Sequence, residues 1–343
     1  MLEKGLVQVY TSESDQMNFA PVGLSLRAVG QGFRVYMACF TFHELMEGEK
    51  LTSELLNPDL TIEHLAVQRD KNDEKTVNPE LIIETFERAK DAVFNGRFDI
   101  VIMNGINQMV TRGIIPRDEI LRVMKEKPEN IELILSGSGA DEEVIEMADL
   151  VTEMVVHKSE YMFPIGNCPD GRGAIEVVTG TGKGKTTYCL GKGMLASGIG
   201  IPALIYQFVK SPKQYGEVKA IQRLPNLDIK TMGRGFLIDH SPYLFEKHRK
   251  AAQQAWHLWM NHIFSRDYGL LVMDEINIAT YHGLISSDRV IEMLLLKTHK
   301  FHLILSGRNA HPEVQRVASS VIEMKEVKHP YMKGIKARKG IEF

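Results

Sequence analysis

The chain of 343 residues has few cysteines and no long apolar run, and each absence excludes a class of protein. Cys39, Cys168 and Cys189 are too few and too scattered in the sequence for a disulfide framework or a zinc site. No apolar stretch approaches the length of a membrane span, and residues 1–10 carry no signal-peptide pattern. We therefore expect a cytoplasmic protein with no membrane partner.

An excess of positive charge is also lacking. The 41 basic and 44 acidic residues give a net charge of −3, so the chain has no electrostatic footprint for a nucleic acid partner. The stretch 325–339 is locally basic, but glycine and aromatic residues interrupt it, and it suits an anionic small ligand or a solvated tail better than a duplex. The twelve histidines form no H-E-x-x-H motif. We expect His248, His257 and His262 on the surface of a helix.

The clearest positive signal is a glycine-rich segment, Thr179-Gly180-Thr181-Gly182-Lys183-Gly184-Lys185-Thr186-Thr187, between a strand-like run and a helix-like run. Such a turn directs successive backbone N–H groups at one point, where the helix N-terminus adds positive charge, so it is typical of a phosphate-binding loop, or P-loop. Lys185 is placed to reach the β- and γ-phosphates, and Thr186 to ligate Mg²⁺. Thr179 stands where the standard motif has its first glycine, which points away from generic ATPases.

The first half of the chain resembles the second half. The matching segments are 4–11 with 172–179, 101–107 with 271–277, 133–137 with 303–307, and 153–154 with 323–324. A repeat of this length indicates a duplicated domain rather than a solenoid unit. We expect one domain at residues 1–168 and a second at residues 169–343, joined by a linker near 164–173.

The two copies differ where chemistry is expected. The segment 12–18 aligns with 180–186 but contains no glycine and no lysine, and its two carboxylates would repel a triphosphate. Asn104-Gly105 replaces Asp274-Glu275, and Ser138 replaces Arg308. We interpret residues 1–168 as a degenerate copy that keeps the fold and has lost catalysis. The alternative is ordinary drift without functional meaning.

Strand-like and helix-like stretches alternate along the second half, and the first half repeats their order. We expect strands at 174–178, 203–209, 227–231, 268–273, 301–305 and 321–324, and helices at 186–197, 241–266, 286–299 and after Pro312. The run 268–273 is almost wholly apolar, as a parallel strand buried on both faces requires. The pattern predicts an α/β fold with mostly parallel sheets, in two tandem three-layer domains that are P-loop NTPase-like (RecA/Rossmann-like).

A second group of polar residues follows the expected strands. Asp274 and Glu275 end the apolar strand, where P-loop proteins place an acid that holds Mg²⁺ directly or through water. Gln207 and Lys210 follow another strand, and Arg308 follows the next, so all point at the crevice at the carboxyl ends of the strands. For Gln207, Lys210 and Arg308, the alternative of ordinary surface polarity stays open.

Together these motifs resemble the P-loop type of corrinoid adenosyltransferase. The resemblance covers the whole second half in the family's order, and the first half resembles the family only through its scaffold. It rests on the P-loop and on the segments 207–210, 233–236, 273–275, 306–308 and 327–342.

The resemblance implies transfer of the 5′-deoxyadenosyl group of ATP to the Co(I) of a corrinoid (cobalamin, cobinamide or cobyrinic acid a,c-diamide), with release of triphosphate, in biosynthesis or salvage. ATP would be the cosubstrate, Mg²⁺ or Mn²⁺ the metal, and a flavoprotein a candidate reductant. Lys185, Glu275 and Arg308 would be catalytic, and Thr186, Asp274 and Glu275 would hold the metal. Related enzymes work as homodimers, which favours either an intrachain pseudo-dimer or a homodimer here.

The corrinoid end of the implied site departs from the family. In that family, an aromatic pair after the Gly-x-Gly-Phe turn displaces the lower axial ligand of cobalt. Phe236 matches the first member, whereas Ile238 stands where the family has tryptophan. This favours an incomplete corrinoid without its lower base, or an altered geometry, and a packing role for Phe236 stays open. The rival functions are a P-loop ATPase or kinase, and a non-catalytic corrinoid or nucleotide-binding protein.

Overall fold

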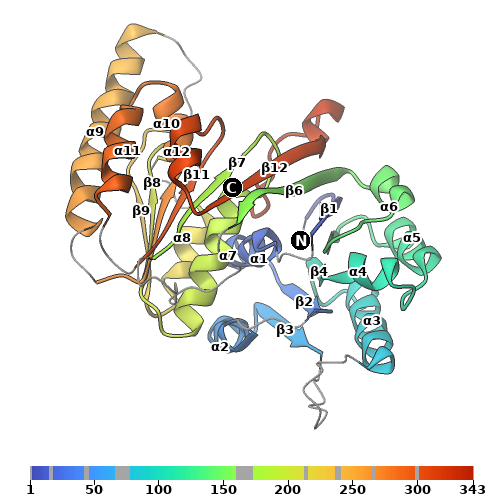
Figure 1. The fold of residues 1–343 in the computed structure, drawn as a ribbon. Helices are drawn as coiled ribbons and strands as arrows, with labels where there is room; N and C mark the ends of the chain where they lie inside the picture. Colours follow the sequence, from blue (N-terminus) through green and yellow to red (C-terminus); the bar gives the residue numbers. More distant parts are fainter. Residues whose placement is uncertain are drawn as a thin grey trace.

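A computed structural model describes residues 2–14, 18–41, 46–65, 78–159, 173–211, 215–235, 241–263, 267–297 and 301–342 (Figure 1). All strands in these ranges belong to one twelve-stranded sheet of order β3-β2-β4-β5-β1-β6-β12-β7-β11-β10-β8-β9. None of the helices described is both long and apolar enough to cross a bilayer. The expected linker, Gly173 excepted, and Cys168 lie outside the described residues.

The first half supplies six strands and six helices of the described chain. They are β1 (Val7–Ser12), α1 (Ala20–Gly30), β2 (Val35–Cys39), α2 (Met46–Leu56), β3 (Leu60–His64), α3 (Pro79–Phe94), β4 (Ile100–Asn104), α4 (Ile106–Thr111), α5 (Arg117–Glu126), β5 (Glu132–Ser136), α6 (Glu142–Met147) and β6 (Leu150–Ser159).

The second half repeats this succession. Its elements are β7 (Ile175–Thr179), α7 (Lys185–Gly198), β8 (Ala203–Gln207), α8 (Gly216–Ile221), β9 (Leu227–Thr231), α9 (Pro242–Ile263), β10 (Leu270–Asp274), α10 (Ile276–Tyr281), α11 (Ser287–Leu295), β11 (His302–Ser306), α12 (Pro312–Val317), β12 (Ser320–Lys328) and the 3₁₀ helix η1 (Pro330–Lys333).

The α/β class with mostly parallel strands is confirmed, and the strand order of one half mirrors that of the other. Neighbouring strands within each half are parallel, while β6 and β12 pair antiparallel and join the two halves into one sheet. The expected strand 321–324 is therefore the start of a longer strand, because β12 has partners on both sides. The short helices α8 and α10 were not expected, since six residues are too few to show a helical period.

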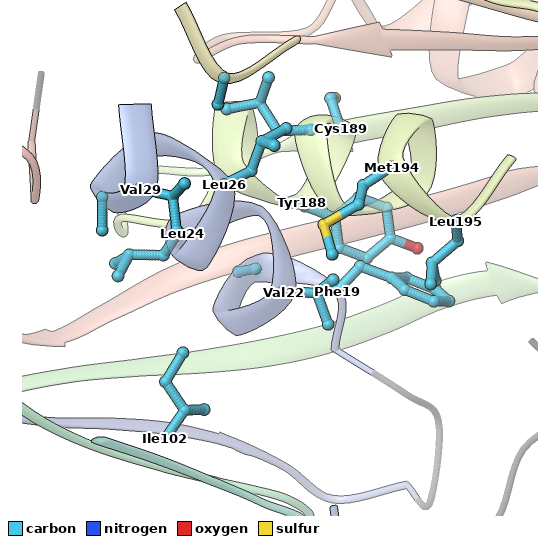
Figure 2. Packing of buried hydrophobic residues seen from close by; sticks show 14 of the residues in the cluster. Phe19, Val22, Leu24, Leu26, Val29, Ile102, Tyr188, Cys189, Met194 and Leu195 are labelled. Atoms are coloured by element: carbon cyan, nitrogen blue, oxygen red, sulfur yellow. The ribbon is translucent and has the colours of Figure 1, made fainter. Parts of the chain in front are cut away.

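The two halves share a hydrophobic core. Helices α1 and α7 pack directly on each other, with Phe19, Val22 and Leu26 facing Tyr188 and Met194 (Figure 2). The Phe19 and Tyr188 rings meet edge to face, with centroids 5.4 Å apart. Each half has a second core on the opposite face of its part of the sheet. The halves are therefore packed as one body rather than linked loosely.

Glycines permit this close approach of helices. A Cβ atom at Gly23 of α1 would lie 1.8 Å from the Thr187 carbonyl oxygen, and one at Gly191 of α7 would lie 2.3 Å from the Phe19 carbonyl oxygen. The same relation recurs on either side, where Gly30 meets Gly216 and Gly198 meets Gly48. An approximate two-fold axis therefore relates the helix pair α1 and α8 to the helix pair α7 and α2.

Substitution of Gly23 by alanine should separate the halves. The methyl group would meet backbone rather than a flexible side chain, so we expect Gly23→Ala to lower the free energy of unfolding in urea by about 3 kcal/mol or more. Gly200→Ala is the matched control: it has φ +78° and nothing within 4 Å of the added Cβ, so it costs only backbone strain of about 1 kcal/mol. Equal losses in the two variants would contradict the interlocked packing.

Candidate active site

A cavity of about 470 Å³ lies at the carboxyl ends of the second-half strands. The carboxyl ends of β7, β8, β10 and β11 meet along this edge of the sheet because these strands are parallel neighbours. Residues of the P-loop, Glu275, Arg308 and the C-terminal segment line the cavity. The first half contributes Gln8, Tyr10, Leu24 and Arg27 to the same cavity.

The P-loop connects β7 to α7 as the glycine spacing predicts. Gly180 and Gly184 adopt φ values of +97° and +112°, which disfavour other residues. The loop rests on β12, since the Gly182 N–H donates to the Met324 carbonyl at 2.6 Å and a Cβ on Gly180 would lie 2.4 Å from that oxygen. A side chain at Gly180 or Gly182 would therefore displace the loop from the sheet.

Thr179, which replaces the first glycine of the standard motif, has a structural contact. Its hydroxyl accepts a hydrogen bond from the Ala310 N–H at 3.2 Å and so ties the P-loop to the loop after β11. Thr11 in the first half accepts from the Ala140 N–H at 3.1 Å in the same way. The threonine therefore belongs to the scaffold that both halves share.

Lys185 lies at the start of α7, and its amine donates to the Gly182 carbonyl at 2.6 Å. Burial lowers the pKa of Lys185 to about 8, and the nearby positive charge of Arg308 acts in the same direction. Arg308 donates to the Thr181 carbonyl at 3.0 Å and so stands beside the P-loop, as expected. Two cations that repel each other across a cavity favour an anionic ligand between them.

Asp274 is fully buried and is the centre of a hydrogen-bond network. Its carboxylate accepts from the hydroxyls of Thr186 at 3.0 Å and Ser306 at 2.6 Å, and from the Gln207 side-chain amide at 3.0 Å. Gln207 thus lies behind Asp274 and orients it. Ser306 was not predicted, although the Ser-Gly pair of both copies was a signal: Ser136 donates to Asn104 at 2.7 Å in the first half.

Glu275 has an unusual backbone conformation. Its φ of +64° lies in the left-handed region, where the first half has Gly105 at +89°, and this costs a residue other than glycine about 1 kcal/mol. Burial, and next the negative charge of Asp274, raise the pKa of Glu275 to about 7. Its Oε2 atom is buried and accepts no hydrogen bond from the described residues. A strained, partly protonated carboxylate facing a cavity is typical of a functional site.

Lys210 lines the cavity, but its amine pairs with Glu217 of α8 at 2.9 Å. Arg27 of the first half approaches the same carboxylate at 3.0 Å. Burial alone would raise the pKa of Glu217, but these two cations outweigh it and hold the pKa well below its usual range. The first half therefore supplies a charge to this end of the site, which the sequence motifs did not indicate.

The C-terminal segment closes the cavity against the first half. Arg27 donates to the carbonyls of Ile341 and Glu342 at 3.1 Å each, and Lys183 of the P-loop pairs with the Glu342 carboxylate at 2.8 Å. Arg338 makes two hydrogen bonds with Glu132 of β5, at 2.7 and 2.9 Å. The segment thus connects the P-loop to both α1 and β5.

The remaining predicted residues are placed as follows. Phe236 and Ile238 lie outside the described residues. His248, His257 and His262 are on α9 as expected; His257 is exposed, and His262 also contacts Lys230 at 2.8 Å. Of the predicted P-loop residues, Gly182 to Thr187 line the cavity, whereas Gly180 and Thr181 are not among its lining residues.

The fold and this site define an α/β protein with a P-loop. The family model of ATP:corrinoid adenosyltransferase BtuR/CobO/CobP matches residues 3–165 and again residues 171–343. The chain therefore belongs to the ATP:corrinoid adenosyltransferase family, and both halves carry its pattern.

Individual proteins agree with this assignment. The corrinoid adenosyltransferase of Pseudomonas aeruginosa is 34% identical over 180 residues, which are 52% of this chain and 88% of that protein. The corrinoid adenosyltransferase of Escherichia coli K12 is 27% identical over 179 residues, 52% of this chain and 90% of that protein. An uncharacterized Nostoc protein is 29% identical over 285 residues, 76% of this chain and 73% of its own length. Among solved structures, a KaiC-like protein of Pyrococcus horikoshii gives a TM-score of 0.29 at 12% identity, over 46% of this chain and 76% of that one.

Proposed function

We propose that this protein transfers the 5′-deoxyadenosyl group of ATP to the Co(I) of a corrinoid substrate and releases triphosphate. The observation that carries the proposal is the intact P-loop site of the second half, set in a chain that matches the adenosyltransferase family twice. In this reaction the electron pair of Co(I) forms the Co–C5′ bond, the C5′–O5′ bond breaks, and its electrons leave with the triphosphate oxygen. The substrate brings its own nucleophile, so the protein has to position it and stabilise the leaving charge.

The residues around the cavity suit these two tasks. Lys185 and Arg308 offer positive charge to the triphosphate, and the N-terminus of α7 adds its backbone N–H groups. Arg27 and the C-terminal segment form a wall that joins the P-loop at Lys183. We assign the corrinoid to the side of the cavity lined by Val209 and Lys210, whose carbonyls accept hydrogen bonds from the turn 232–235.

Mg²⁺ or Mn²⁺ fits the acidic group at the end of β10. The Thr186 hydroxyl, Asp274 and the unpartnered Oε2 of Glu275 are hard oxygen donors within one small region. Bound there, the metal would neutralise charge on the triphosphate. Asp274 is held in place by Gln207 and Ser306, while Glu275 retains an oxygen that is free to ligate.

The metal requirement should depend on pH because of Glu275. With a pKa of about 7, the carboxylate is mostly protonated at pH 6, so we expect the affinity for Mg²⁺ in the presence of ATP to be roughly tenfold lower at pH 6 than at pH 8. Mg²⁺ titrations of turnover at both values measure this. Glu275→Gln is the matched control. Its side chain does not titrate, so the pH dependence that remains in this variant includes that of ATP but not that of residue 275. A variant with the same pH dependence as the unmodified protein would contradict the role of Glu275.

Product analysis tests the proposed function directly. Anaerobic incubation with ATP, Mg²⁺ and chemically reduced cobalamin or cobinamide should form the cobalt–carbon bond, visible in the absorption spectrum, with one triphosphate per adenosyl group. Orthophosphate released in proportion to turnover would favour an ATPase instead. Binding of ATP with no product of either kind would favour a non-catalytic binding protein.

We further propose a division of labour between residues 1–168 and 169–343. The positions equivalent to Asp274 and Glu275 hold Asn104 and Gly105, which offer no carboxylate for a metal, although the hydrogen bond from the serine that ends the neighbouring strand is kept. One ATP per chain follows from this, and titration calorimetry measures it. The first half then acts as the partner that completes the site of the second half.

A further inference from the structure

Three potential metal ligands meet in the first half, and none of them lines the P-loop cavity. Cys39 ends β2, His64 ends the neighbouring edge strand β3, and Glu49 lies on α2 beside them (Figure 1). The Cys39 Sγ atom is 3.7 Å from the Glu49 Oε2 atom, which is 3.4 Å from the His64 Nε2 atom. All three ligand atoms lie within 4.8 Å of one another. Cys39 and Glu49 are buried, and the His64 side chain is 13% exposed.

The two separations from the Glu49 oxygen match a tetrahedral metal centre. With Zn–S near 2.3 Å and Zn–N and Zn–O near 2.0 Å, tetrahedral angles put sulfur and oxygen about 3.5 Å apart and nitrogen and oxygen about 3.3 Å apart. The observed distances of 3.7 and 3.4 Å need only small movements to reach these values. A thiolate, an imidazole and a carboxylate are also the donor set that Zn²⁺ prefers among common divalent cations.

The mirrored position in the second half shows what is special about this cluster. Strand pairing makes Gln207 and Thr231 equivalent to Cys39 and His64. The glycine contacts make Glu217 equivalent to Glu49, because Gly216 meets Arg27 as Gly48 meets Leu195. One half therefore has two neutral residues, and the other has two metal ligands, around the same buried carboxylate.

The charges around the two glutamates differ in the same sense. Glu217 is held by Arg27 and Lys210. In the alignment of the two halves, Leu195 and Phe42 are equivalent to Arg27 and Lys210, and Phe42 lies outside the described residues. Both are apolar, and the Glu49 carboxylate has the His64 Nε2 atom 3.4 Å away.

We propose that Cys39, Glu49 and His64 bind Zn²⁺ through Sγ, Oε2 and Nε2, with water in the fourth position. The Cys39 thiol loses its proton on binding, because the thiolate is the ligand. The metal would fasten the edge strand β3 and helix α2 to β2, and α2 in turn packs on α7 of the second half at Gly48 and Gly198. Sequence spacing missed the site because its ligands come from three separate elements.

Metal binding to the full-length chain tests the proposal. The protein is first dialysed against a chelator and kept free of ATP and corrinoid, and then titrated with Co²⁺ as a spectroscopic probe and with Zn²⁺ in competition. We expect about one metal per chain, a sulfur-to-cobalt charge-transfer band, and a higher thermal midpoint with Zn²⁺. Cys39→Ser should remove the charge-transfer band, and both Cys39→Ser and His64→Gln should weaken binding at least about tenfold, since losing even an outer partner of a ligand costs about 10–100-fold.

Two matched variants separate this site from others. Cys168→Ser should keep the charge-transfer band, and Asp274→Asn should keep Zn²⁺ binding, because the P-loop site is not involved. Absence of the band in the unmodified protein, or equal affinity in His64→Gln and the unmodified protein, would overturn the proposal. Should Cys39→Ser fail to fold, His64→Gln decides, since that side chain is partly exposed and glutamine fills similar space.

Discussion

Replacing Lys185 with alanine is expected to abolish ATP-dependent adenosylation while the protein stays folded. The Lys185 amine lies in the P-loop beside Arg308 and the acidic pair, where it can meet the phosphates of ATP. Loss of a single preorganised charge donor typically costs about 10²–10³-fold in turnover. We expect a loss at the upper end of this range, together with a much weaker affinity for ATP.

The stability of the Lys185→Ala variant should not fall. The pKa of Lys185 is lowered, which means that the folded protein disfavours the charged amine. This charge therefore costs stability as the pH falls below the ordinary lysine value of 10.5, and in full below about pH 8; ATP offsets that cost on binding. Thermal unfolding without ATP should show an equal or higher midpoint, whereas the increase caused by added ATP should vanish.

An exposed lysine provides the control for this experiment. Lys125 lies on α5 of the first half and is exposed, so Lys125→Ala should keep both turnover and the stabilisation by ATP. Near-normal adenosylation by Lys185→Ala would show that the P-loop is not the ATP site.

Sequence patterns predicted the strands, helices and turns that depend on residues close together in the chain. The strand 227–231 has the expected bounds, and the P-loop with its following helix begins within one residue of the expected position. Both depend on residues close together in the chain, either an apolar run bounded by turns or glycines between a strand and a helix. The placement of Asp274 and Arg308 beside the P-loop followed as well, because parallel strands bring their carboxyl ends to one edge.

The contacts between the halves could not be predicted in this way. The residue patterns of β6 and β12 suit either an edge strand or an interior strand. The alternation of side chains along a strand does not indicate which other strand it pairs with. Arg27 belongs to none of the sequence motifs, yet it reaches Glu217 and the C-terminal carbonyls across the interface. The left-handed backbone of Glu275 was not predicted either. The sequence hints at it through Gly105, the glycine at the equivalent position of the first half.

Expression of residues 169–343 alone should give a protein that is inactive and self-associates or precipitates. Without the first half, β12 loses its antiparallel partner β6 and becomes an exposed edge, and the apolar face of α7 loses α1. The C-terminal segment loses Arg27 and Glu132, which anchor it beside the P-loop. Misplacement of such a wall by 1 Å can cost about 10²-fold in rate, so we expect at least this loss in any soluble fraction.

Supplying residues 1–168 as a separate chain should restore solubility and turnover, because the interface consists of pairing and packing that need no covalent link. Arg27→Leu in the full-length chain is the matched finer variant, since the equivalent position of the second half holds Leu195. It should keep the sheet and the fold, but should release Glu217 and the C-terminal segment and so lower turnover more than ATP affinity. A fully active isolated second half, or calorimetry showing two equivalent ATP sites per chain, would refute the view that the first half serves as the built-in partner of one active site.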